Sequence, residues 1–395
     1  MVIQEFSMKE QTRLVHGGME LFEDYEYVNP PVYRASTVLH PSFEDMIERA
    51  MAEMTMTNKK PTYGTYGSPT HHAFYRALCA LEGPKAVGAW SYPTGLAACT
   101  IPLTAFLKAG DHCLLVDTIY GPTREYFDVY LRRFGIETEF FDPMVGSAID
   151  KHFKPNTRLV FMETPGSHTF ELMDVPAIAQ KCQEHNIVSA IDNTWATALN
   201  FKPMEAGVDV VIHAATKYIA GHSDVTMGVV ICNEKTWPAV YRTSVQNGQT
   251  TSCDDIYLAY RGLHSMAARM KQAVASAYEI VDWLLKQPQV ERVLWPALPT
   301  DPSYEIFRRD FKGPSALFAV LFKPEYAGKL APMINALQLF GRGYSWGGYE
   351  SLLIGGYGTR TVRPMPFDRM VRISVGLEDP EDLIGDLKQA MQKIK

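Results

Sequence analysis

The sequence predicts an α/β fold, with a mostly parallel sheet in a large domain and a smaller α+β domain at the C-terminal end. Between residues 68 and 262, short unbroken apolar runs rich in Val, Ile and Leu alternate with helical segments. This alternation is typical of a parallel sheet covered by helices on both faces. Beyond residue 262 one long helical stretch is followed by a few isolated strands. We therefore expect an arm at 1–66, a large domain at 67–262 and a small domain at 263–395.

Each element follows from its own pattern. Helices are expected where apolar residues recur three or four positions apart and the stretch ends near glycine or proline, at 70–81, 94–108, 122–134, 174–185, 266–286, 324–337 and 380–394. Strands are expected at unbroken apolar runs, at 85–90, 112–116, 136–141, 158–162, 187–191, 208–212, 227–231, 316–322 and 370–375. The residues before about position 60 show no clean period, and their aromatic side chains indicate an arm packed against another surface.

Composition excludes several classes of protein. The 395 residues are 46% hydrophobic and 21% charged, which is ordinary globular usage and not that of a disordered chain. A net charge of −6 without runs of Lys and Arg disfavours a nucleic-acid groove. No apolar run approaches the roughly 18 residues that a membrane span needs, and residues 1–20 lack the apolar core of a secretion signal. We expect a cytoplasmic protein with no nucleic-acid or membrane partner.

The cysteines predict neither disulfides nor a metal site. The six are scattered, and none has C-x-x-C spacing, so we expect reduced thiols. His71-His72 and His112-Cys113 are adjacent pairs, and neighbours in a helix or a strand do not share a face. We therefore expect no metal.

Polar residues follow five of the expected strands, at 91–96, 117–122, 163–167, 192–195 and 213–218. In open α/β sheets, ligands bind outside the carboxyl ends of the strands. These segments contain an anion-binding turn at Gly95, the aromatic Tyr120, the carboxylate Asp192 and the amine Lys217. We expect them to meet in one site.

The type of cofactor follows from what is absent and what is present. No G-x-G-x-x-G or G-x-x-x-x-G-K-[ST] motif follows a strand, which disfavours a dinucleotide or a nucleoside triphosphate. A phosphate turn, an aromatic side chain, a carboxylate and a lysine are what pyridoxal phosphate needs. The lysine holds its aldehyde as a Schiff base, and a carboxylate keeps its pyridine nitrogen protonated.

Four segments carry a family resemblance: 63–70 (YGTYGSPT), 192–196 (DNTWA), 214–224 (AATKYIAGHSD) and 376–379 (GLED). In this order, and over essentially the whole chain, they resemble the Cys/Met-metabolism family of pyridoxal-phosphate enzymes. The resemblance implies the aspartate-aminotransferase-like fold, fold type I. It also implies that the cofactor lies in the large domain and that the active unit is at least a dimer, usually within a tetramer.

Within this family the chain is most similar to the cystathionine β-lyase branch, in residues 344–351 (YSWGGYES), 163–167 and Ala214. Other branches usually carry serine at position 214 and asparagine near Ser167. The branch implies cleavage of L-cystathionine to L-homocysteine, pyruvate and ammonia, a step toward methionine, with desulfurisation of cysteine-type S-conjugates. Two alternatives stay open: a methionine or cystathionine γ-lyase or sulfhydrylase, and a cofactor-binding regulatory protein with little turnover.

The resemblance also implies roles around the cofactor ring. Lys217 forms the Schiff base and then acts as acid and base. Asp192 pairs with the pyridine nitrogen, and Tyr120 stacks on the ring and assists catalysis. All three follow expected strands.

At the phosphate, the resemblance implies backbone N–H donors from Gly95 and Leu96 and the hydroxyl of Thr216. Tyr63 would reach the phosphate of the neighbouring subunit and border its substrate. The family usually places an arginine two residues after that tyrosine, and this chain has Thr65 there. We expect weaker cofactor retention as a result.

For the substrate, the resemblance implies that Arg372 clamps the α-carboxylate of a sulfur amino acid with two hydrogen bonds. Ser345 and Trp346 would line the pocket for the substrate side chain. The glycines that follow Trp346 favour a pocket wall over an ordinary core position.

Overall fold

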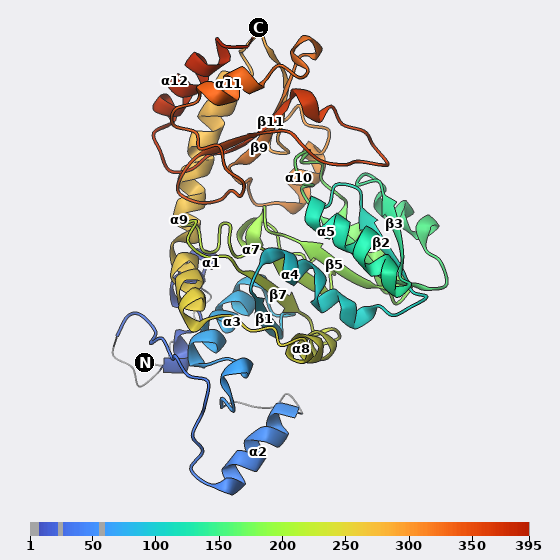
Figure 1. The fold of residues 1–395 in the computed structure, drawn as a ribbon, viewed down its shortest axis with the longest axis vertical. Coiled ribbons are helices and arrows are strands. Elements are labelled where there is room, and N and C mark those ends of the chain that lie inside the picture. The colour runs from blue at the N-terminus through green and yellow to red at the C-terminus, as the bar shows by residue number, and fades with distance from the viewer. Residues whose placement is uncertain (1–7, 23–26, 55–59, 395) are drawn as a thin grey trace.

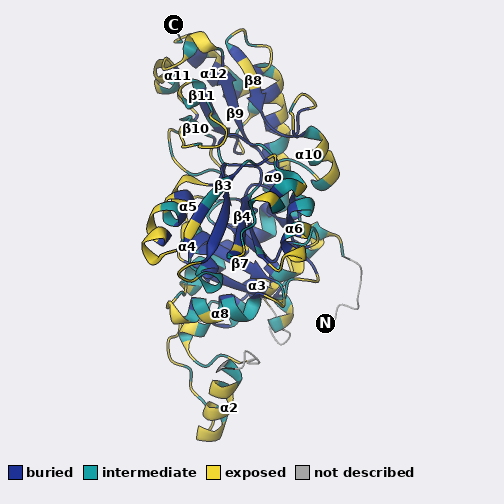
Figure 2. Ribbon diagram, turned by 90° about the vertical axis from the view of Figure 1, so that its right-hand side faces the viewer, coloured by how far each residue is buried: buried dark blue, intermediate teal, exposed yellow. Residues whose placement is uncertain are grey.

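The computed structural model describes residues 8–22, 27–54 and 60–394. Its centre is a seven-stranded sheet in the order β1-β7-β6-β5-β4-β2-β3, and Figures 1 and 2 show helices on both faces of this sheet and a smaller sheet beyond one end. The strands are β1 Gly88–Tyr92, β2 His112–Val116, β3 Glu137–Phe141, β4 Thr157–Glu163, β5 Val188–Asp192, β6 Val210–His213 and β7 Gly228–Cys232. The expected α/β class is confirmed.

The sheet is mostly parallel, as expected, and β7 is its exception. Strands β2 to β6 pair in parallel, whereas β7 is antiparallel to both β6 and β1. A parallel pair needs a crossover connection, usually a helix. The segment 214–227 between β6 and β7 contains turns and no helix. The chain therefore returns antiparallel, and this return carries Lys217.

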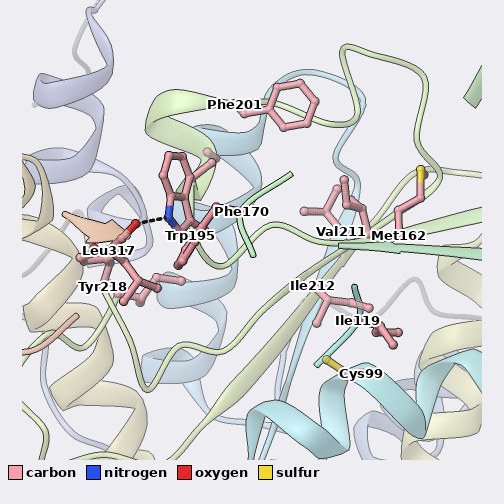
Figure 3. Close-up of a cluster of buried hydrophobic side chains, with 14 of the residues drawn as sticks. Cys99, Ile119, Met162, Phe170, Trp195, Phe201, Val211, Ile212, Tyr218 and Leu317 are labelled. Carbon is pink, nitrogen blue, oxygen red and sulfur yellow. Dashed lines mark hydrogen bonds between the residues drawn. The ribbon is translucent and has the colours of Figure 1, made fainter. Parts of the chain in front are cut away.

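Burial on both faces explains why the strands appear in the sequence as unbroken apolar runs, and one hydrogen bond joins the two sheets. Every residue of β1, β2 and β7 is buried, because both faces of the sheet are covered. At the boundary, the indole nitrogen of buried Trp195 donates to the carbonyl of Leu317, 2.9 Å away (Figure 3). Buried Trp side chains usually find such a partner, and this one ties the large sheet to the small one.

The small sheet is antiparallel, in the order β10-β11-β9-β8. Its strands are β8 Val290–Leu294, β9 Leu317–Phe322, β10 Leu352–Gly355 and β11 Met370–Ser374. The inner strands β9 and β11 match the two expected strands. The edge strands β8 and β10 were not expected, because each has only one neighbour and keeps accessible positions, so neither forms an unbroken apolar run.

Helix α9, Cys253–Leu284, is 32 residues long and begins well before the expected start at 266. The side chain of Ser252 caps it. In Figure 1 it runs from the large sheet to the small one. The division at residue 262 therefore falls inside a continuous helix, and the three-part division stays a prediction. Within the described ranges, no helix is both long and apolar enough to span a bilayer.

Two of the expected helices are interrupted, and several of the observed helices were not expected. The stretch 94–108 divides into α4 Gly95–Thr100 and a 3₁₀ helix Pro102–Phe106, since Pro102 lacks a donor. The stretch 324–337 divides into a 3₁₀ turn Pro324–Tyr326 and α11 Ala331–Ala336 around Gly328, whose φ is 72°. The other helices are α1 Glu10–His16, α3 Pro69–Glu82, α5 Gly121–Glu125, α6 Val175–Glu184, α7 Thr197–Asn200, α8 Trp237–Gln246, α10 Tyr304–Asp310 and α12 Pro380–Met391. After α5 the chain continues as π and 3₁₀ turns to Phe134.

The arm contains a helix that the sequence analysis missed. Helix α2, Phe43–Met54, projects away from the body (Figures 1 and 2). Its Phe43, Met46, Ile47 and Met51 are exposed, and their spacing is that of one helical face. An apolar face in this position is consistent with an arm that packs on another surface.

A buried carboxylate joins the C-terminal part to the large sheet. Asp117, directly after β2, accepts hydrogen bonds from Arg360 and Arg124 at 2.9 and 3.1 Å and from the backbone N–H groups of 361–363. Burial alone would raise the pKa of Asp117, but the hydrogen bonds from Thr361 and Arg360 hold this pKa below its usual range. The segment around residue 360 is thereby fixed against the large sheet.

Replacement of Asp117 by Asn tests this connection. We expect the free energy of unfolding to fall by about 3 kcal/mol, because buried Arg124 loses its counter-ion and buried Arg360 keeps only that of Glu171. Urea midpoints of the cofactor-free protein measure the change. Asp142→Asn is the matched control, because its pair with Arg363 is partly exposed and should change stability by only about 0.5 kcal/mol. Equal effects of the two changes would contradict the assignment.

Candidate active site

The carboxyl ends of the central strands of the large sheet meet the small sheet around one cavity of about 300 Å³. Segments after β1, β2, β4, β5 and β6 line it from the large sheet, and β11 and the segment before β10 line it from the other side. The cavity brings together nine of the residues expected from the sequence: Gly95, Leu96, Tyr120, Asp192, Thr216, Lys217, Ser345, Trp346 and Arg372. Tyr63 and Thr65 lie outside it.

Asp192 ends β5 and faces the cavity. Its Oδ1 accepts from the backbone N–H and the hydroxyl of Thr194, at 2.9 and 2.5 Å, and its Oδ2 accepts from the Cys99 thiol at 3.4 Å. Burial raises the pKa of Asp192, and the hydrogen bonds from Thr194 oppose that rise. The result is a rigid carboxylate, suited to a cationic ligand atom.

Lys217 lies in the turn after β6. Its Nζ donates to the Ser345 hydroxyl at 2.6 Å and lies 5.4 Å from the centre of the Trp346 ring. Desolvation and the nearby Arg372 charge lower the pKa of Lys217 to about 8, against the opposing charge of Asp192. A larger neutral fraction at physiological pH makes the amine a better nucleophile and base.

The turn that carries Lys217 is held from α9. The Arg269 guanidinium donates to the carbonyls of Tyr218 and Ile219, at 2.8 and 3.3 Å, and to Gly262 at 2.8 Å. Gly221 ends the turn with a φ of 71°, and a Cβ there would lie 1.8 Å from an Arg269 nitrogen. Only glycine fits both this conformation and this contact.

The turn before α4 offers backbone donors. The Thr94 side chain accepts from the Ala97 N–H at 3.0 Å, and within the described chain the N–H groups of Gly95 and Leu96 have no acceptor. Thr216 is different. Its hydroxyl donates to the Met227 carbonyl at 3.1 Å and accepts from the Met227 N–H at 2.8 Å. To donate to a phosphate it must give up the carbonyl of Met227.

Arg372 and Ser345 form the opposite wall. Arg372 donates through one nitrogen to the Ser345 carbonyl at 2.9 Å, and its other nitrogens have no partner among the described residues, so they can bind a carboxylate. Ser345 has a φ of 81°, uncommon for a residue other than glycine. This strained residue connects the amine of Lys217 to the guanidinium of Arg372.

Some cavity residues were not identified from the sequence. Glu163 was noted at the end of a strand but was given no role, although its neighbour on the adjacent strand is Asp192. His168 and Tyr357 pack edge to face, with ring centres 4.3 Å apart. They come from irregular segments and carried no signal. Among the described residues, no three His, Cys, Asp or Glu side chains are placed to hold a metal ion.

Comparison with known proteins identifies the family. A model of the Cys/Met metabolism PLP-dependent enzymes matches residues 11–392. The chain belongs to this family. Its cofactor is therefore pyridoxal phosphate, and the chain is a lyase-type enzyme. A solved structure of metB from Corynebacterium glutamicum is similar at a TM-score of 0.88 with 29% identity, covering 98% of this chain and 99% of that one.

Individual relatives cover nearly the whole chain. A putative cystathionine β-lyase of Rhizobium johnstonii is 44% identical over 96% of this chain and 94% of its own length. An L-alanine/L-glutamate racemase of Wolbachia pipientis is 39% identical, over 98% of each chain. Cystathionine β-lyase MetC of Escherichia coli is 37% identical over 98% of this chain and 99% of its own.

The cavity fits the cofactor. Asp192 presents a carboxylate, Lys217 an amine of lowered pKa, and residues 95 and 96 present unpaired N–H groups on one surface. A Cβ on Gly95 would lie 2.7 Å from the Cβ of Ala214, so a side chain there would crowd the turn. These are the acceptor, the nucleophile and the donors that the protonated pyridine nitrogen, the aldehyde and the phosphate require.

The influence of Arg372 on Lys217 can be measured. In Arg372→Gln we expect the pKa of Lys217 to rise from about 8, because a neighbouring positive charge is lost. The measurement is the pH dependence of pyridoxal-phosphate capture by the cofactor-free protein, with the adduct trapped by borohydride and located at Lys217 by mass spectrometry. Arg342→Gln, outside the cavity, is the control. A capture midpoint that stays the same in Arg372→Gln would contradict the electrostatic account.

Proposed function

We propose that this enzyme cleaves the Cβ–S bond of L-cystathionine to give L-homocysteine, pyruvate and ammonia, and that it also accepts cysteine-type S-conjugates. The observation that carries the proposal is the chain of contacts from Lys217 through Ser345 to Arg372. It holds a base and a carboxylate clamp at a fixed separation. The full-length similarity to relatives named cystathionine β-lyase supports the choice of substrate.

In this proposal, Arg372 binds the α-carboxylate and directs the Cα–H bond toward Lys217. Neutral Lys217 takes the α-proton, and its hydrogen bond to Ser345 holds the amine in position. When bound, pyridoxal phosphate supplies the conjugated ring that accepts the electron pair left at Cα. Asp192 balances the charge of the pyridine nitrogen, and Tyr120 covers one face of the ring.

The same residues can assist the departure of the thiolate leaving group. The electron pair at Cα forms the Cα–Cβ double bond as the Cβ–S bond breaks and the thiolate leaves. Protonated Lys217 can donate its proton to the departing thiolate, and Trp346, packed edge to face on Tyr218 at 5.4 Å, lines the same cavity. The three-carbon product hydrolyses to pyruvate and ammonia.

A second candidate is amino-acid racemisation, favoured by the 39% identical relative named as an L-alanine/L-glutamate racemase. It uses the same removal of the α-proton, followed by return of a proton from the other face instead of loss of sulfur. The γ-lyase alternative instead requires a second proton removal at Cβ. The products distinguish all three activities.

Product analysis tests the function. Protein loaded with pyridoxal phosphate is incubated with L-cystathionine, and the keto acid is identified by mass spectrometry. We expect pyruvate with homocysteine. 2-Oxobutyrate with cysteine would replace the proposal with a γ-lyase. A parallel incubation with L-alanine that gives D-alanine, while L-cystathionine gives no pyruvate, would replace it with a racemase.

Lys217→Ala is the control for this assay. It should lower turnover by at least about 10³-fold, because both the nucleophile and the base are lost. Retained turnover in this variant would remove Lys217 from the mechanism.

We infer that the arm completes the site of a second subunit, in a dimer or a pair of dimers. Tyr63 pairs with Thr37 in an isolated bridge, is 47% exposed and does not line its own cavity. Exposed apolar residues of α2 lie on the same arm. An arm of this kind supports a role for Tyr63 at the phosphate of a neighbour.

Thr65→Arg tests this role of the arm. We expect the dissociation constant of pyridoxal phosphate to fall about tenfold, because a charge-assisted hydrogen bond to the phosphate is gained. Fluorescence titration of the cofactor-free protein measures it. Thr65→Gln, which adds a polar side chain without charge, should bind the cofactor as the parent does. No tightening in the Arg variant would place Thr65 away from the phosphate.

A further inference from the structure

Two carboxylic side chains stand side by side on the floor of the cavity. Glu163 is the last residue of β4, Asp192 is the last residue of β5, and the two are register partners in a parallel pair. Neighbouring strands lie about 4.8 Å apart, and paired residues share a face. Both side chains line the cavity. Two ionised carboxylates on neighbouring positions of a buried surface repel each other strongly, so one of the two groups keeps its proton.

The hydrogen bonds decide which group keeps the charge. Asp192 accepts from the N–H and hydroxyl of Thr194 and from the Cys99 thiol. The charge of Lys217 also acts on Asp192. Glu163 accepts from the Tyr120 N–H at 2.6 Å through its Oε2 and contacts Ser167 through its Oε1, and the charge of Asp192 acts against its own. The negative charge therefore stays on Asp192 and the proton goes to Glu163.

Electrostatics agree with this assignment. Desolvation and the charge of Asp192 raise the pKa of Glu163 to about 8, against the hydrogen bonds from Ser167 and Tyr120. The other charged and titratable side chains that line the cavity are Cys99, Tyr120, His168, Asp192, Lys217, Tyr344, Tyr357 and Arg372. The two cations lie on the Lys217 turn and on β11, and the nearest carboxylate is that of Asp192.

Protonation of Glu163 reverses the direction of its hydrogen bond with Ser167. The Glu163 Oε1 and the Ser167 Oγ are 2.5 Å apart. An ionised Glu163 would take the only hydrogen of the Ser167 hydroxyl. A neutral Glu163, whose Oε2 already accepts from Tyr120, donates through Oε1 to Ser167 instead. The Ser167 hydrogen is then available elsewhere, and Ser167 lines the cavity.

We propose that Glu163 is a positioning residue that works as a neutral acid, donating to Ser167 so that the Ser167 hydroxyl donates to an oxygen of the ligand bound in the cavity. The same side chain holds the backbone of Tyr120 through its other oxygen. Its proton therefore fixes the direction of a hydrogen bond at the ligand. The kinetic arm of the test rests on the proposed function, whereas the spectroscopic and binding arms do not.

Glu163→Gln is the decisive variant, because an amide reproduces the neutral acid: its oxygen accepts from Tyr120 and its NH₂ donates to Ser167. We expect its affinity for pyridoxal phosphate and its kcat/KM to stay within about threefold of the parent at pH 7. The parent should lose activity as the pH rises through about 8, where Glu163 ionises. The Gln variant should lose this alkaline limb, while Lys217 still sets the acid limb.

Infrared spectra provide a readout that needs neither cofactor nor turnover. Burial raises the pKa of Glu82 to about 8 as well, so the cofactor-free parent should show the carbonyl stretch of two protonated carboxyl groups that disappears as the pH passes about 8. Glu163→Gln should lose the part of this band that belongs to Glu163, which the difference between the parent and variant spectra isolates. Glu137→Gln, at the opposite end of the sheet and paired with Lys154, is the matched control and should keep the band and the alkaline limb.

Ser167→Ala identifies the acceptor. It should weaken either cofactor affinity or KM by about tenfold, the size expected for one hydrogen bond to a charged group. A change in affinity assigns the oxygen to the cofactor, and a change in KM assigns it to the substrate. A loss of more than about 100-fold in Glu163→Gln with an unchanged pH profile, or a protonated-carboxyl band that Glu163→Gln leaves at its full intensity, would overturn the proposal.

Discussion

The contact between Arg269 and the turn that carries Lys217 is the constraint on which the rest of the site depends. A guanidinium from the long helix α9 binds three backbone carbonyls and no carboxylate. Its donors replace the water that these carbonyls would otherwise bind. The turn closes over Gly221, β7 returns antiparallel, and Lys217 points into the cavity. Because α9 also reaches the small sheet, the same helix sets the position of the lysine and of the wall facing it.

The cavity is a low-dielectric space that contains two pairs of groups of like charge. Lys217 and Arg372 repel each other, and Asp192 and Glu163 do the same. The first repulsion lowers the pKa of Lys217 and so enlarges its neutral fraction, and the second raises the pKa of Glu163, which favours a proton on that carboxyl group. In the proposed function, Arg372 is the positive group that binds the substrate and Asp192 is the negative group beside the cofactor nitrogen. A ligand with the opposite arrangement of charge is therefore matched before it binds.

Sequence reasoning located the floor of the site better than its far wall. Asp192 and Lys217 follow strands whose apolar runs are unmistakable, and the sheet brings such ends together whatever the details of the helices. Only the two inner strands of the small sheet were predicted, since edge strands such as β8 keep exposed positions and form no unbroken apolar run. His168 and Tyr357 come from segments without regular structure. Their placement depends on Asp117 and Arg360, whose pairing across 243 residues has no local signal.

Helix α2 was missed for a different reason. Its apolar residues have helical spacing, but they face outward in a single chain and so form no part of its core. Glu163 shows another limit of prediction from sequence. Its position at a strand end was visible, but a role that depends on the Asp192 side chain and on the direction of one hydrogen bond requires coordinates.

The division of the cavity between two parts of the chain has a consequence for synthesis. The floor, with Lys217, Asp192, the turn at Gly95 and the Arg269 that holds the lysine turn, lies within the first 269 residues, whereas Ser345 and Arg372 are among the last to leave the ribosome. N-terminal units generally fold first during translation. A nascent chain therefore acquires its aldehyde-reactive amine before its carboxylate clamp. The hydrogen bond between Arg360 and Asp117 forms late in this order. The groups that select an amino acid are therefore placed after the groups that activate one.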